Sequence, residues 1–192
     1  MARPRDPRRR TEILDAVIAH LAETGIAHLS LRPLAQALGH STRVLTHHFA
    51  DKDALITAVL ERLDEIQHGQ LRATEGWDDT SRGIGAVVRD SWRRHLEPGN
   101  IGATRLVHEI EGLAAAGRLG GRVPKFLADR ADFVAGALRA RGLAPDTARV
   151  HATFLNSAYA GLQADVLVTG DRARTEAALA ELCALADSWT RA

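Results

Sequence analysis

The stretch LAQALGHSTRVLTHHF, residues 34–49, decides the fold because it places two short helical patterns on either side of one glycine. Gly39 ends the first pattern, and the absence of a side chain permits the left-handed backbone that a tight turn requires. Ser41 is a good N-cap for the second pattern. Two helices joined by such a turn form the skeleton of a helix-turn-helix. The stretch is therefore either a corner of a helical core or a surface shaped to enter a DNA groove.

The second helix of this stretch favours the DNA-binding interpretation. Arg43 lies near its N-terminus, where recognition helices meet base edges, and arginine pairs with guanine O6 and N7. Lys52 stands in the first turn of the next helix, where the helix dipole disfavours a cation unless a phosphate binds there. The expected DNA-contacting residues are Arg8, Arg9, Arg10, Ser30, Arg32, Ser41, Thr42, Arg43, Thr46, His47, His48 and Lys52.

Positive charge is concentrated at the N-terminus. Residues 1–50 carry seven arginines and four acids, whereas the other 142 residues carry 18 basic and 20 acidic side chains. Five of the arginines fall within MARPRDPRRR, residues 1–10, whose two prolines argue against a helix. We expect a flexible basic arm that reaches phosphates or the minor groove. A solvated, frayed terminus without a ligand is an equally weighted alternative.

Composition and periodicity predict an all-α protein of about nine helices. Apolar residues make up 45% of the 192 residues, helix formers dominate, and the alternating pattern of strands does not appear. A polar, glycine-punctuated stretch at 68–80 predicts a boundary between an N-terminal three-helix domain, residues 7–67, and a C-terminal helical domain, residues 81–192. The helix-turn-helix itself is expected at about 30–49.

Cysteine usage and hydropathy exclude two other classes of protein. The single Cys183 rules out an internal disulfide framework. The sequence contains neither an apolar run near 18 residues nor a signal peptide, so we expect a cytoplasmic protein without a membrane partner.

The segment from Thr11 to Leu60 resembles the N-terminal DNA-binding domain of the tetracycline-repressor (TetR) family. The resemblance rests on the spacing of Gly39, Ser41, His48, Phe49, Lys52 and Leu55, together with the preceding helix. Two positions depart from the family pattern. His40 replaces a residue that is usually apolar, and Thr46 replaces a tyrosine that commonly touches a backbone phosphate. Because threonine is shorter, the phosphate contact at that position is in doubt.

The last two helical segments are apolar over more than one face, so they need partners on two sides. A symmetric dimer formed through a four-helix bundle supplies those partners, and two recognition helices would then read a palindrome. A buried central helix of a monomer is the alternative. The expected dimerisation residues are Ser157, Ala158, Gly161, Leu182, Leu185 and Trp189.

The resemblance also implies a small-molecule effector, because the C-terminal helices of the family enclose a ligand pocket. Effector binding would change the separation of the two recognition helices and weaken operator binding. No motif selects the residues of such a pocket. The candidate ligand-binding residues are Trp92, His108, Phe133, Asn156, Tyr159 and Gln163.

Metal and catalytic sites are not expected, and no cofactor is predicted. His47 and His48 point about 100° apart on a helix, so they cannot easily share one ion. Glu109 and Glu111 are predicted to form solvated pairs with Arg105 and His108 at the edge of an apolar stripe.

The sequence therefore predicts a TetR-like regulator that is not an enzyme: a homodimeric, ligand-responsive repressor of a palindromic double-stranded DNA operator. Two alternatives remain open at this point. One is an all-α enzyme that uses His108 with Glu109 or Glu111, and the other is an interaction module with a vestigial helix-turn-helix.

Overall fold

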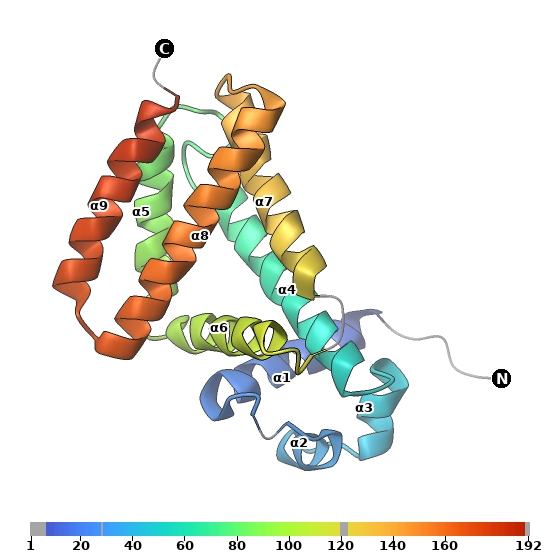
Figure 1. The fold of residues 1–192 in the computed structure, drawn as a ribbon. Helices are drawn as coiled ribbons and strands as arrows, with labels where there is room; N and C mark the ends of the chain where they lie inside the picture. Colours follow the sequence, from blue (N-terminus) through green and yellow to red (C-terminus); the bar gives the residue numbers. More distant parts are fainter. Residues whose placement is uncertain (1–6, 28, 120–122, 191–192) are drawn as a thin grey trace. The chain divides into compact units, whose positions relative to one another are not determined.

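The structure is a computed structural model that describes residues 7–27, 29–119 and 123–190. These residues form nine helices and no strand, which confirms the all-α prediction (Figure 1). None of the described helices is both long enough and apolar enough to cross a membrane. In chain order the helices are α1 (Pro7–Thr24), α2 (Leu31–Ala37), α3 (Thr42–His48), α4 (Lys52–Arg72), α5 (Ile84–His95), α6 (Ile101–Ala115), α7 (Val123–Ala140), α8 (Pro145–Thr169) and α9 (Arg172–Ser188).

The described residues divide into two compact units. Unit 1 holds the residues up to Glu65 and those from Pro98 to Pro124, and unit 2 holds 66–97 and those from Lys125 onward. The division differs from the expected one. We expected residues 81–192 to form the C-terminal domain, but α6, which lies in that range, belongs to unit 1. Leu106 and Ile110 of α6 are buried there, and α6 packs on α1. A long-range contact of this kind leaves no local signal in the sequence.

Unit 1 is built around the apolar stripe of α1. Its members recur with helical spacing and are fully buried: Ile13, Leu14, Val17, Ile18 and Leu21. Leu45 and Phe49, the anchors of the helix-turn-helix, are buried in the same unit. Arg62 of α4 donates two hydrogen bonds to Asp15 of α1, with N–O distances of 2.8 and 3.1 Å, which ties these two helices together.

The start of α1 corrects one prediction. We expected the first helix to begin at about Arg9, after a basic arm whose two prolines argue against a helix, but α1 begins at Pro7. Proline is tolerated in the first turn of a helix, where its missing N–H has no intrahelical acceptor. Arg8, Arg9 and Arg10 therefore belong to a helix, while Arg3 and Arg5 lie outside the described residues.

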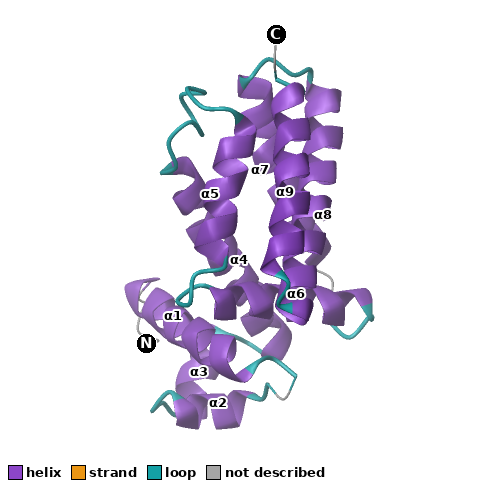
Figure 2. Ribbon diagram, turned by 90° about the vertical axis from the view of Figure 1, so that its left-hand side faces the viewer, coloured by secondary structure: helices purple, strands orange, loops and turns teal. Residues whose placement is uncertain are grey.

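Unit 2 is a bundle in which α9 packs on both α5 and α8 (Figure 2). The approach of α9 to α5 depends on Gly85, because a Cβ atom there would stand 2.5 Å from the carbonyl oxygen of Cys183. Gly170 closes α8 in the left-handed conformation, and Asp171 caps α9 by accepting from the Arg174 amide. A glycine and an aspartate, residue types that favour these two positions, thus stand at the junction of α8 and α9.

Candidate DNA-binding surface and ligand cavity

The turn between α2 and α3 has the geometry that its sequence predicts. Gly39 adopts a φ of +68° and its amide donates to the carbonyl of Gln36, while the His40 amide donates to the carbonyl of Ala35 at 2.8 Å. These two bonds satisfy carbonyls at the end of α2 and fix the direction in which the chain enters α3. The helix pair is therefore held by backbone hydrogen bonds of the turn as well as by packing.

Helix α3 has a buried side that anchors it and an exposed side that is polar. Leu45 is fully buried and Phe49, directly after the helix, is buried as well, whereas Arg43, Thr46 and His47 are exposed. The helix contains no carboxylate. It therefore exposes hydrogen-bond donors and a cation, which can pair with base edges and phosphates.

The hydroxyl of Thr46 is engaged within its own helix. It donates to the Thr42 carbonyl at 3.1 Å and lies 3.3 Å from the Arg43 carbonyl. The side chain thus reaches back along α3 rather than away from it. This arrangement strengthens the doubt about a phosphate contact from this position.

The other candidate DNA-contacting residues lie on several elements of unit 1. Ser30 and Ser41 occupy the N-cap positions of α2 and α3, but neither side chain makes a capping hydrogen bond. Arg32 is exposed on α2, and Thr42 and His48 are half-buried on α3. Every one of these positions remains a prediction as a DNA contact.

The basic residues of α1 divide into two kinds. Arg8 and Arg9 are exposed, whereas Arg10 is half-buried and its guanidinium lies 5.3 Å from the centre of the Phe49 ring. This cation–π contact secures the residue that follows α3. Arg10 thus has a packing role that the expected flexible arm did not include.

Lys52 begins α4 directly after the residue that caps this helix. The Asp51 carboxylate accepts a 2.7 Å hydrogen bond from the Ala54 amide, so Asp51 supplies the acid that the helix dipole favours. Lys52 is half-buried and adds a cation at the same helix end. Its position suits a phosphate held jointly with helix N–H groups.

Unit 2 contains a cavity of about 60 Å³ lined by residues of α4, α5, α7 and α8 and by Trp77. Aromatic rings dominate one wall. The Phe133 ring stacks on His68 at 3.7 Å and on Trp77 at 4.9 Å between ring centres, and the Arg72 guanidinium lies 5.0 Å from it. These rings therefore stack on one another along this wall.

A second wall of the cavity is polar. The Tyr159 hydroxyl donates to Ser91 Oγ at 3.3 Å and lies 2.9 Å from His95 Nδ1. Burial raises the pKa of the Tyr159 phenol, which therefore stays protonated and able to donate. The Asn156 amide nitrogen is buried and has no hydrogen-bond partner among the described residues. Such an unsatisfied donor is costly unless a water or ligand accepts from it.

Three of the six candidate ligand residues line this cavity, namely Phe133, Asn156 and Tyr159. Trp92 and Gln163 are buried in unit 2 but do not line it, although Trp92 packs edge-on against Tyr159. His108 belongs to unit 1, where it lies 3.8 Å from Glu111 on α6. No motif in the sequence fixes the direction in which each of these three side chains points.

Sequence reasoning missed most of the other lining residues, among them His68, Trp77 and Arg130. His68 and Trp77 fall in the segment 68–80 that we took as a polar boundary. In the structure α4 continues through His68 to Arg72, and Trp77 is buried in the loop that follows. A tryptophan inside a glycine-punctuated polar stretch was the signal that could have identified this wall.

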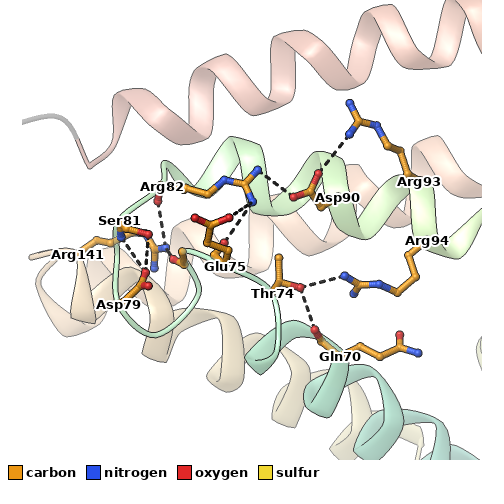
Figure 3. A network of polar contacts seen from close by, with 11 residues as sticks. Gln70, Thr74, Glu75, Asp79, Ser81, Arg82, Asp90, Arg93, Arg94 and Arg141 are labelled. Atoms are coloured by element: carbon orange, nitrogen blue, oxygen red, sulfur yellow. Dashed lines mark hydrogen bonds and ion pairs between the residues drawn. The ribbon is translucent and has the colours of Figure 1, made fainter.

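The loop 73–83, which carries Trp77, is held by a polar network (Figure 3). Arg141 donates to the carbonyls of Gly76 and Trp77, Arg94 donates to Thr74 Oγ1 at 3.0 Å, and Arg82 pairs with Asp90 at 2.9 Å. The network connects the loop to α5 and to the turn after α7. It therefore fixes the Trp77 side of the cavity.

The candidate dimerisation residues do not all lie on one free face. Leu182 is buried in the core of its own protomer, which corrects our expectation that it faces a partner. Ser157, Gly161 and Leu185 are exposed, whereas Ala158 is half-buried and Trp189 stacks on His151. The exposed face also carries apolar side chains that we did not name: Val150, Phe154 and Val168.

The residues of the enzyme alternative are engaged in packing. The Glu109 carboxylate accepts from the Ile26 amide at 2.9 Å, so it is not the solvated edge group that we expected. No group of three or more metal-ligating side chains occurs in the described part of the chain.

Comparison with known proteins finds a family match for the N-terminal part of the chain. Residues 13–59 match the family described as "Bacterial regulatory proteins, tetR family". The chain is 29% identical over 106 residues to the HTH-type transcriptional regulator BetI 2 of Chromohalobacter salexigens, a match covering 53% of this chain and 50% of that protein. It is 41% identical over 68 residues to an HTH-type transcriptional repressor of Mycobacterium tuberculosis, covering 35% and 36%. The chain thus spans about half or less of these relatives.

Solved structures share the fold over nearly the whole chain. A TetR-family member from Streptomyces coelicolor superimposes with a TM-score of 0.73 and 24% identity, covering 94% of this chain and 99% of that one. The multidrug-binding protein EbrR, complexed with imidazole, gives 0.70 and 24%, covering 95% and 93%. At these identities the likeness extends to the fold.

Proposed function

We propose that this chain is a member of the tetR family of bacterial regulatory proteins, and that it is a homodimeric transcriptional repressor in which a small molecule controls binding to the operator. The observation that carries the proposal is the presentation of α3. Leu45 and Phe49 fix the helix from one side, and Arg43 and His47 stand exposed on the other. A recognition helix requires both properties, because only a rigid helix can hold side chains in register with base edges.

The proposed repressor acts as a dimer in the cytoplasm. The exposed side of α8 carries Val150 and Phe154, and α9 carries Leu185, with 65%, 49% and 44% of each side chain accessible in one protomer. Ser157 and Gly161 on the same side of α8 allow close helix approach. Burial of this face against a second copy would remove the apolar surface from water. Two copies of α3 would then reach successive major grooves about 34 Å apart.

The proposed contacts to DNA fall into two classes. Arg43, Thr42 and His47 are proposed to meet base edges, and Ser30, Arg32, Ser41, His48 and Lys52 to meet the backbone. Thr46 is assigned to neither class, because its hydroxyl is bonded within α3. Arg8 and Arg9 are proposed to reach the adjacent backbone from the start of α1. Only the first class would discriminate between sequences.

An affinity titration tests this proposal. Fluorescence anisotropy would compare a duplex from the region flanking the chain's own gene with a shuffled duplex, each at two salt concentrations. We expect tighter binding to the first duplex and affinity that falls steeply with salt for both. Equal affinity for the two duplexes, or a monomer by light scattering, would overturn the proposal.

A further inference from the structure

Arg10 differs from the two arginines that precede it in what it contacts. Arg8 and Arg9 are exposed, whereas the guanidinium of the half-buried Arg10 lies 5.3 Å from the centre of the Phe49 ring. This distance is within the range of a cation–π contact, which strengthens where water is excluded. Phe49 is only 2% exposed, so its ring is largely shielded from water. The contact therefore holds the start of α1 against the residue that follows α3.

The surroundings of Arg10 favour the ring over a phosphate. A hollow of about 460 Å³ in unit 1 is lined by Arg10 together with the carboxylates of Asp51, Asp53 and Glu61, which would repel an approaching anion. Arg10 forms no ion pair with these acids in the part of the chain that the structure describes. Lys52, the proposed phosphate contact, does not line this hollow. The Phe49 ring is thus the partner that the geometry gives to Arg10.

Phe49 connects this contact to the recognition helix. Its amide donates to the Leu45 carbonyl at 2.8 Å and closes the last turn of α3. The centre of its ring lies 6.3 Å from that of His48, and the His48 ring meets the His47 ring edge-on at 5.1 Å. A continuous series of contacts therefore leads from α1 to His47, an exposed residue that we propose meets base edges.

We infer that Arg10 is a positioning residue for sequence recognition, which acts through the Phe49 ring to fix the orientation of α3 on α1. Arg10 itself touches neither a base nor a phosphate, and this role replaces our expectation of a DNA contact at the position. The inference rests on the proposed function, because it concerns how α3 reads DNA. A less firmly held α3 loses discrimination between sequences, since base readout depends on the placement of α3 and phosphate attraction carries no sequence information.

Two quantities separate a positioning residue from a phosphate contact. Fluorescence anisotropy of the full chain gives the ratio of its affinities for the flanking and shuffled duplexes, and a salt series gives the slope of log affinity against log salt. Arg10→Gln should lower the ratio about fivefold, the size of one cation–π contact, and leave the slope unchanged. Arg10→Lys keeps a cation and should restore most of the ratio.

Arg9→Gln is the matched control, because Arg9 is the exposed neighbour on the same helix. It should leave the ratio unchanged and reduce the slope by about one. An unchanged ratio in Arg10→Gln, or a slope reduced by about one in that variant, would overturn the inference.

A double-mutant cycle tests the route through the ring. Phe49→Leu keeps an apolar side chain but removes the ring, so Arg10→Gln should lower the ratio no further in this background. A further fivefold loss would overturn the inference. The preference of the native chain for the flanking duplex tests the proposed function separately, so the two failures are distinguishable.

Discussion

Oε2 of Glu109 accepts a 2.9 Å hydrogen bond from the backbone amide of Ile26, a residue 83 positions earlier in the chain. Gly25, directly before Ile26, has a φ of +75°, and a Cβ atom there would stand 3.1 Å from the same carboxylate oxygen. The contact joins α6 to the turn after α1 within unit 1. The helix-turn-helix thus belongs to a unit that includes a helix distant in sequence.

Removal of this acceptor should destabilise the protein. Glu109→Ala leaves the part-buried Ile26 amide without its partner, which costs about 1–3 kcal/mol of the free energy of unfolding. Glu109→Gln keeps an oxygen in place and should cost less. Urea denaturation of both variants measures the difference, and equal losses would show that charge rather than the hydrogen bond matters.

Two glycines of α6 provide a matched pair. A Cβ atom at Gly102 would lie 2.9 Å from the Ala22 carbonyl oxygen of α1, whereas one at Gly112 would meet nothing within 4 Å. Gly102→Ala should therefore destabilise by about 1–3 kcal/mol through overpacking. Gly112→Ala should stabilise by roughly 0.5–1 kcal/mol, because alanine is the better helix former. Thermal unfolding checks both signs, and a stabilising Gly102→Ala would contradict the close approach of these helices.

The stability of the protein should depend on pH through His68. Burial, Arg72 and Arg130 lower its pKa to about 4, below the ordinary value of 6.5, while Asp129 acts weakly in the opposite direction. The unfolded chain therefore binds more protons than the folded chain between these two pH values. The free energy of unfolding is thus highest above pH 6.5 and falls as pH decreases toward 4.

Urea denaturation at pH 7 and pH 5 measures this effect. His68→Phe keeps a ring against Phe133 and should show a smaller loss of stability at pH 5 than the native chain. The exposed His47→Gln should retain the native pH dependence. An unchanged pH dependence in His68→Phe would assign the effect to another group.

The two lysines of the chain allow a controlled test of phosphate binding. Lys52→Ala should weaken binding to every duplex to a similar extent and reduce the slope of log affinity against log salt by about one. Lys125→Ala, exposed on α7, should leave the slope unchanged. Equal slopes for the native chain and Lys52→Ala would exclude a phosphate contact from Lys52.

Local signals in the sequence were sufficient for much of the fold. The periodicity of α1, the left-handed Gly39 and Gly170, and the caps Asp51 and Asp171 are properties of neighbouring residues, and the structure contains all of them. The exception is the start of α1, where the same proline that argues against a helix also fits its first turn.

Long-range contacts could not be predicted in the same way. The partnership of Glu109 with Ile26 and the inward direction of Leu182 depend on how helices far apart in sequence pack. The aromatic wall combines His68, Trp77 and Phe133 from three segments, so no single motif contains it. Three cavity residues were named because the resemblance indicated which helices to consider.

The most direct test of the account is the effect of Arg43→Ala on two duplexes, measured by fluorescence anisotropy at one salt concentration. If α3 reads base edges, the variant should lose about 1–3 kcal/mol, or roughly tenfold to a hundredfold in affinity, on the operator. Its affinity for a shuffled duplex should change much less. Equal losses on both duplexes, or no loss on either, would contradict the claim that α3 recognises sequence.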